Sequence, residues 1–200
     1  RRQRQMCIRD SHFAVLGPQI LSKDQKVISL MEPIAPRAVY IVHRWLIQCQ
    51  LVLCRFIPGF FDAVDAVKNC VGKLRKPKKQ APTAVESKLQ PQKDIMLRGC
   101  FWIFSPDYVE RFDGLDDRTF LYREEQLLFI RLKKNGLHTY YDPELKIIHL
   151  EDAATNAVAK TEFKKRVFTL QNEVKSMKIL IDALKDYQGC LLYTSDVADD

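Results

Sequence analysis

The sequence of 200 residues predicts an α/β fold followed by a long amphipathic helix. Short apolar runs with strand character are interspersed with helical segments, which is the pattern of a mixed fold. Between Ala157 and Gln188 there is no Pro or Gly, and apolar residues recur every three or four positions. Apolar residues make up 46% of the chain and charged residues 28%, so composition and length together indicate one ordinary globular domain.

The first predicted element is a strand. The apolar run Phe13–Leu16 is broken by Gly17-Pro18 and resumes at Ile20. Because Gly-Pro is a typical turn dipeptide, we expect a strand that leads into a turn at this point.

The most apolar window, residues 38–61, is AVYIVHRWLIQCQLVLCRFIPGFF. Its length would nearly span a bilayer, but polar and charged residues interrupt it: His43, Arg44, Gln48, Gln50 and Arg55. Charges near the middle of a membrane span are expensive. We therefore predict a buried or interfacial amphipathic helix in preference to a transmembrane one, with its end at Pro58-Gly59.

Residues 68–93 are basic, rich in Pro and Gln, and poor in large apolar side chains. This composition predicts a mobile, solvated surface loop. A patch for a membrane or a nucleic acid is the alternative, although no aromatic residues are interleaved for base stacking.

Regular structure is expected to return at residue 95. IMLRGCFWIF predicts a strand with Gly99 inside it, and glycine within a strand often marks a close approach of backbone or ligand. Ser105 is then placed as the N-cap of a short helix, with Pro106 at its first position. A second helix is predicted from Glu124 to a left-handed cap at Gly136.

The last third of the chain predicts two strands and a helix. LHTYY and LKIIHL have strand character and are separated by the turn DPE. In the helix that follows, steps of four and three residues connect an apolar stripe: Phe163, Val167, Leu170, Val174, Met177, Ile181 and Leu184. Such a stripe needs a cover, which we expect to be the domain itself, a second copy or a membrane interface.

Both ends of the chain resemble translated sequencing adapter. A transposon-type adapter translates in one frame to RRQRQMCIRD and the start of a Ser codon, and its reverse complement translates to CLLYTSDAAD. The chain begins with RRQRQMCIRDS and ends with CLLYTSDVADD, so Val197 is the one mismatch. We therefore expect residues 1–11 and 190–200 to be adapter-derived and residues 12–189 to be part of a longer protein. A natural basic N-terminal arm is the alternative.

The net charge and the cysteines limit the possible partners and the cellular compartment only in general terms. The net charge of +7 favours nucleic acid, an anionic membrane surface or a phosphorylated substrate as a partner. The cysteines between the two end segments are Cys49, Cys54, Cys70 and Cys100. They form no pair with zinc spacing, and we expect free thiols in a reducing compartment.

Two adjacent acids, Glu124 and Glu125, stand at the start of the second predicted helix. Acids in a first turn are stabilised by the helix dipole by about 0.3–1 kcal/mol each, which by itself explains many such pairs. Catalysis is the other explanation, because a carboxylate beside the apolar walls of Phe120 and Tyr122 can have its pKa tuned for general base work. A neighbouring carboxylate would raise that pKa further.

The order of motifs resembles the C-terminal half of family 2 glycosyltransferases, which have the GT-A fold. The resemblance is strong over residues 98–156 and extends to VLGPQIL near the start. Between residues 25 and 93, no part of the sequence can be aligned with the family. The matching residues are Gly99, Ser105, Phe120, Leu121, Tyr122, Glu124, Glu125, Leu128, Arg131, Gly136, Tyr141, Pro143 and His149. Leu127 stands where one branch of the family has Asp, which favours the polysaccharide or rhamnosyltransferase-like branch.

The resemblance implies an incomplete GT-A fold over residues 12–156, with a helical segment at 157–189. It assigns Glu125 as the general base, with Glu124 to raise its pKa or orient the acceptor. It also implies substrate binding by Gly99, Tyr122 and Arg131. His149 is a candidate contact for a metal ion or the donor diphosphate, although a single His at a strand end is often structural.

The implied reaction is transfer of a sugar from a nucleotide-diphosphate donor to a saccharide or lipid-linked acceptor. The family uses Mg²⁺ or Mn²⁺ held by an Asp-x-Asp motif, which is expected in the longer protein upstream of Phe13. The aspartates at 62 and 65, and at 113 and 116, have the wrong spacing and place. We expect a cytoplasmic enzyme of polysaccharide synthesis, in peripheral contact with the inner membrane face and without a nucleic-acid partner. The alternative is a non-enzymatic basic module that binds a membrane surface or nucleic acid.

Overall fold

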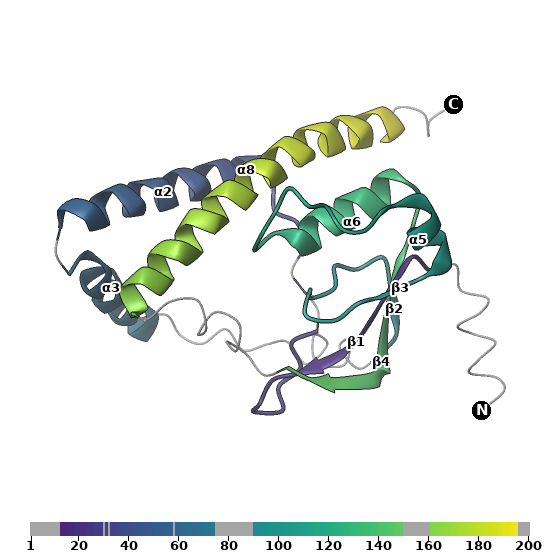
Figure 1. The fold of residues 1–200 in the computed structure, drawn as a ribbon, viewed down its shortest axis with the longest axis horizontal. Coiled ribbons are helices and arrows are strands. Elements are labelled where there is room, and N and C mark those ends of the chain that lie inside the picture. The colour runs from purple at the N-terminus through teal and green to yellow at the C-terminus, as the bar shows by residue number, and fades with distance from the viewer. Residues whose placement is uncertain are drawn as a thin grey trace.

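The computed structural model describes residues 13–29, 31, 33–57, 59–74, 90–149 and 161–195. The fold is mixed α/β (Figure 1). Its elements are β1 (Val15–Leu21), α2 (Arg37–Phe56), α3 (Phe60–Leu74), β2 (Gln92–Lys93), β3 (Ile103–Phe104), α5 (Pro106–Arg111), α6 (Glu124–Lys134), β4 (Thr139–Ile148) and α8 (Glu162–Ser195).

The sheet has four strands in the order β2-β4-β1-β3. The two central strands, β1 and β4, run parallel, and the two-residue strands β2 and β3 each pair antiparallel with a central strand. Apart from its last residue, β1 is buried along its length. The sheet is therefore mixed, as expected for an α/β fold.

Two predicted turns are replaced by one irregularity inside continuous strands. Pro18 pairs with Asp142, but the next residue of β1, Gln19, pairs with Lys146, so three residues of β4 bulge out. Pro18 has no N–H to donate to the ladder, and a bulge is where a strand can accommodate such a residue. The predictions of a turn at Gly17-Pro18 and at the DPE segment were therefore wrong.

Helix α6 is the middle layer of the molecule. On one side, Leu128 and Leu132 pack with Tyr141 and other buried residues of the sheet layer. On the other side, Leu127 and Ile130 pack against α2 and α8. The order of layers is sheet, α6, then the pair α2 and α8 (Figure 1). Packing of α6 on the sheet was predicted and is confirmed.

The apolar stripe of α8 is covered by the domain. Met177, Ile181 and Leu184 are buried against α2 and α6, whereas Phe163 at the start of the helix is 54% exposed. Side chains of α2 secure the contact, because Arg37 Nε donates to the Ile181 carbonyl (3.1 Å) and Arg44 Nε donates to the Val174 carbonyl (3.2 Å). The stripe was expected to pack against the domain, a second copy or a membrane interface. Packing against the domain is confirmed from Leu170 to Leu184.

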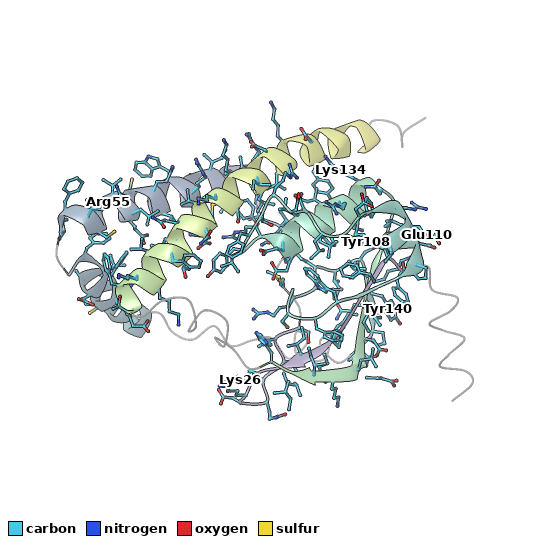
Figure 2. All side chains as sticks on the ribbon, viewed as in Figure 1. Lys26, Arg55, Tyr108, Glu110, Lys134 and Tyr140 are labelled. Atoms are coloured by element: carbon cyan, nitrogen blue, oxygen red, sulfur yellow. The ribbon has the colours of Figure 1, made fainter. Side chains whose placement is uncertain are left out.

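Helix α2 agrees with the predicted amphipathic helix and ends at Phe56. Its far end, marked by Arg55, lies well away from Tyr140 of β4 and from Lys26 in the turn after β1 (Figure 2). No helix within the described ranges is long and apolar enough to cross a membrane.

Two predicted segments need correction. Most of the expected strand at 95–104 is irregular, since β3 covers only Ile103–Phe104 and Gly99 lies in a turn. The expected loop at 68–93 begins inside helix α3, which continues to Leu74, and it ends with strand β2. Residues 75–89 of that loop lie outside the described residues.

Candidate functional site

The entry to α6 has an unusual backbone. Tyr122 and Arg123 adopt positive φ angles of 70° and 72°, in the left-handed region that non-glycine residues seldom occupy. Arg123 is the N-cap of α6, yet its side chain makes no capping hydrogen bond. Two consecutive strained residues persist only where their surroundings hold them, and such strain concentrates at functional sites.

Helix α8 holds this entry in place. The Tyr122 hydroxyl donates to Thr169 Oγ1 (3.3 Å), and Ser176 Oγ donates to the Leu121 carbonyl (2.6 Å). Arg123 forms an ion pair with Glu173 at 2.5 Å, with both side chains largely buried. The predicted substrate-binding residue Tyr122 thus also fixes the loop that presents the two acids.

Glu125 lies against the backbone of Gly99. The Gly99 N–H donates to Glu125 Oε1 at 3.2 Å, and a Cβ atom at position 99 would lie only 2.8 Å from that oxygen. A close approach of backbone or ligand was predicted at Gly99; the group that lies there is the Glu125 side chain, and substrate binding by Gly99 stays a prediction. The structure brings together two residues that the sequence analysis singled out separately.

Glu125 opens into a surface depression of about 260 Å³. The lining residues are Met31, Tyr122, Arg123, Glu124, Glu125, Gln126 and Glu173. Three carboxylates and one guanidinium therefore line one concave site.

Two buried polar atoms belong to residues of this depression. Arg123 Nε and Gln126 Oε1 have no hydrogen-bond partner within the part of the chain that the structure describes. Both atoms are shielded from solvent, and three further buried side-chain atoms without a partner among the described residues belong to Arg98, Trp102 and Thr119, outside this depression. The two atoms therefore do not by themselves indicate a ligand in the depression.

Burial changes the electrostatics of the acid pair. Desolvation raises the pKa of Glu124 above its usual value, and the charge of Glu125 raises it further. A backbone N–H and the positive charge of Arg123 oppose the shift without cancelling it. Near neutral pH, Glu124 is therefore easier to protonate than an ordinary glutamate.

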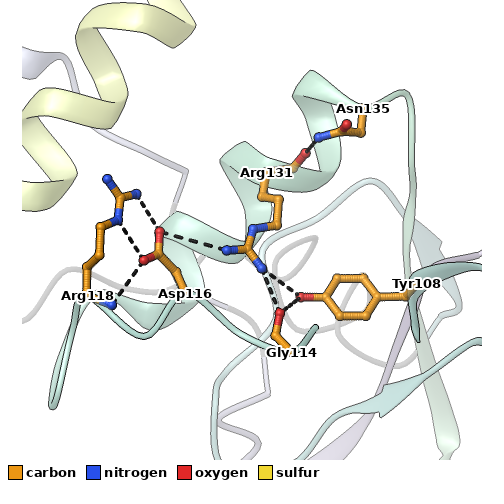
Figure 3. A network of polar contacts seen from close by, with 6 residues as sticks. All are labelled: Tyr108, Gly114, Asp116, Arg118, Arg131 and Asn135. Atoms are coloured by element: carbon orange, nitrogen blue, oxygen red, sulfur yellow. Dashed lines mark hydrogen bonds and ion pairs between the residues drawn. The ribbon is translucent and has the colours of Figure 1, made fainter. Parts of the chain in front are cut away.

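Arg131, for which substrate binding stays a prediction, makes several contacts within the protein. Its Nη1 donates to the Gly114 carbonyl (2.7 Å) and the Tyr108 hydroxyl (3.3 Å), and its Nη2 lies 4.0 Å from Asp116 Oδ2 (Figure 3). The guanidinium also lies over the Phe112 ring, 5.2 Å from its centroid. It clamps the loop after α5 and lines a depression there of about 410 Å³, which shares no residue with the one at Glu125.

His149 follows β4, where its backbone N–H donates to the Leu21 carbonyl (2.8 Å). In the described parts of the chain, no three His, Cys, Asp or Glu side chains are grouped so as to hold a metal ion.

Sequence reasoning missed one polar cluster. His138 Nδ1 lies 2.9 Å from Asp94 Oδ1, and Lys133 Nζ lies 3.1 Å from the same oxygen. Partial burial alone would raise the pKa of Asp94, but the hydrogen bonds from His138 and Lys133 outweigh it and lower that pKa. The cluster ties β2 to β4 and α6; no signal in the sequence points to it, since His138 and Asp94 are 44 residues apart.

The four cysteines expected to be free thiols are free. The pKa of the Cys100 thiol, next to Gly99, is raised by burial, which makes this group a poor nucleophile near neutral pH.

Comparison with known proteins gives no assignment: no protein-family profile, no curated protein and no solved structure matches this chain.

Proposed function

We propose that this chain is the acceptor-side part of a glycosyltransferase, which transfers a sugar from a nucleotide-diphosphate donor to a saccharide or lipid-linked acceptor in cell-surface polysaccharide synthesis. The observation that carries the proposal is the hydrogen bond from Gly99 N–H to Glu125 Oε1 at the edge of a concave site. The ordered motif set that resembles family 2 glycosyltransferases supports it.

Glu125 acts in this proposal as the general base. The acceptor hydroxyl attacks the anomeric carbon of the donor sugar, a new carbon–oxygen bond forms, and the bond to the diphosphate breaks. The hydroxyl proton passes to Glu125. Because Oε1 accepts the Gly99 N–H, we assign proton acceptance to Oε2.

Glu124 has a different role from Glu125 in the proposed reaction. Its raised pKa favours the protonated form more than in an ordinary glutamate, and a protonated carboxyl can donate a hydrogen bond. We propose that Glu124 orients the acceptor hydroxyl beside Glu125. The Arg123–Glu173 ion pair holds the strained loop from which both acids project.

The donor diphosphate and its Mg²⁺ or Mn²⁺ are assigned to the expected upstream part of the protein. When bound, the metal would offset negative charge on the departing diphosphate. His149 could add one nitrogen ligand, but the described residues supply no complete set, so no step is attributed to the metal here.

The test is to express the complete reading frame that contains this chain and to follow release of nucleoside diphosphate from a panel of nucleotide sugars. Glu125→Gln should lower turnover by roughly 10²–10⁴ with donor affinity near normal, as expected for loss of a general base. Glu124→Gln is the matched neighbour and should lower turnover less. Unchanged turnover in Glu125→Gln, or an upstream frame without an Asp-x-Asp motif, would refute the proposal.

A second candidate, a basic module that binds a membrane surface without catalysis, is favoured by the exposed apolar side of α2. Glu125→Gln would leave such binding unchanged, which distinguishes the two functions.

A further inference from the structure

Helix α2 presents an entirely apolar face to the outside of the molecule. The residues of this face, called the α2 outer face below, are Ala38, Val39, Ile41, Val42, Trp45, Leu46, Cys49, Val52, Leu53 and Phe56. At about 100° per residue, they cover about 160° of the helix circumference, opposite the buried residues Tyr40 and Ile47. A surface helix normally turns polar residues outward, so the pattern of α2 is reversed on this side.

The large side chains of this face are exposed to solvent. Phe56 is 77% exposed, Trp45 62% and Val42 57%. Contiguous exposed apolar surface of this kind marks an interaction site. Scattered apolar residues would need no such explanation, but these recur at every turn of a 20-residue helix.

Within the described residues, α8 covers the opposite side of α2. The apolar stripe of α8 is itself used by this contact and by α6. Among the described residues, α2 lies at the edge of the molecule (Figure 1), and the α2 outer face is opposite Tyr40 and Ile47, which pack in the cluster with α6 and α8.

The charges of α2 identify the kind of partner. The helix has no acidic residue and three basic ones, Arg37, Arg44 and Arg55, which share one flank of the apolar face. Apolar residues that include Trp and Phe, bordered by Arg, are the composition of helices that lie in the interface of an anionic membrane. Helix α2 is not apolar enough to be a candidate membrane span.

We propose that the α2 outer face docks the protein onto an anionic lipid bilayer, with Trp45 and Phe56 inserted at the level of the headgroups and the exposed Arg55 near the lipid phosphates, while Arg37 and Arg44 hold α8 and add positive charge to the same flank. A second copy of the chain fits this face less well, because α2 has no acidic residue that could pair with the arginines of another α2. The inference does not rest on the proposed transferase activity.

The test uses the whole chain and vesicles of phosphatidylcholine with or without phosphatidylglycerol. The chain has two tryptophans, so Trp102→Phe leaves Trp45 as the sole fluorophore. Its emission should shift to the blue and resist acrylamide quenching with anionic vesicles only. Trp45→Glu and Phe56→Glu, scored by co-sedimentation, should each lower partitioning by about tenfold or more.

Val109→Glu is the matched control, because Val109 is also 64% exposed but lies on α5, away from the α2 outer face. It should partition as the unmodified chain does. The four arginines among the first nine residues are common to all variants, so differences between variants report on α2. Circular dichroism melts check that each variant is folded.

Two results would overturn the proposal. One is equal partitioning of the unmodified chain, Trp45→Glu and Phe56→Glu. The other is that the unmodified chain does not bind anionic vesicles. If light scattering then shows a dimer that Trp45→Glu dissociates, the face belongs to a second copy of the chain. If it shows a monomer, the face has neither of these partners.

Discussion

Glu125 Oε1 accepts a hydrogen bond from the Gly99 N–H at 3.2 Å, across 26 residues of sequence. The contact is possible because Gly99 has no side chain; a Cβ there would meet the Glu125 carboxylate at 2.8 Å. The backbone of an irregular segment thereby sets the position of the proposed base.

Gly99→Ala should move the Glu125 carboxylate while the fold is preserved. The clash is with the end of a flexible side chain, and the Gly99 backbone does not have a positive φ, so the fold can absorb the change. In the complete enzyme, turnover should fall by about 10-fold to 100-fold, because misplacing a catalytic group by about 1 Å has effects of this size. Cys100→Ala, the next residue of the same turn, is the control and should keep full turnover. Equal activity of both variants would contradict the role given to Gly99.

The Arg123–Glu173 pair should show strong energetic coupling. Both side chains are largely buried, and Arg123 also lies over the Tyr40 ring. A double-mutant cycle with Arg123→Ala and Glu173→Gln, measured by urea denaturation, should give a coupling of about 1–2 kcal/mol. The exposed pair Lys134–Asp186, at 4.0 Å, is the matched control and should give a coupling near zero. Similar values for the two pairs would mean that the buried pair does not hold the entry to α6.

Arg131→Lys should destabilise the protein and not act through substrate affinity. Lysine keeps the charge but loses the planar fork that binds the Gly114 carbonyl and the Tyr108 hydroxyl together. We expect the free energy of unfolding to fall by about 1–2 kcal/mol. Arg111→Lys, on the exposed side of α5, should change it little. If the variant has normal stability and the complete enzyme has a raised KM, Arg131 binds substrate and this prediction is wrong.

Asp94→Asn should weaken the fold in a pH-dependent way. The pKa of Asp94 is lowered in the folded state, so its carboxylate stabilises the fold above the unfolded pKa of about 4, and this stability is lost as the pH falls through the folded pKa. Asp94 is about one-third exposed, which limits the loss to about 1 kcal/mol at pH 7. The difference between wild type and variant should shrink below pH 4. Asp24→Asn, in an exposed turn, should show no such dependence; a loss that does not change with pH would contradict the ion-pair explanation.

Helices α5 and α6 follow from local sequence alone. Ser105 caps α5 by accepting the Tyr108 N–H at 3.3 Å, and Gly136 has the left-handed φ of 64° expected of a helix end. Caps and apolar periodicity act over a few residues, so they can be read without knowledge of the fold. The long helix α8 was predictable from periodicity for the same reason.

Strand continuity was not predictable from sequence. Gly17-Pro18 looks like a turn, yet β1 continues because β4 supplies a matching bulge after Asp142. Packing at Gly17 is tight, since a Cβ there would lie 2.8 Å from Leu97 Cδ2 and the Leu97 side chain would have to shift. Whether a strand bends or ends depends on the strand with which it pairs. Local sequence propensity carries no information about that partner.

The sequence by itself determined that α2 is apolar, that two acids open α6, and that Gly99 permits a close approach. Tertiary structure decided which groups meet: Glu125 with Gly99, and Asp94 with His138. It also decided which side of α2 faces outward, because α8 buries Ile47 and leaves Trp45 exposed. The physical reason is that contacts between residues distant in the chain depend on how whole elements pack, and that packing depends on the combined surfaces of all the elements.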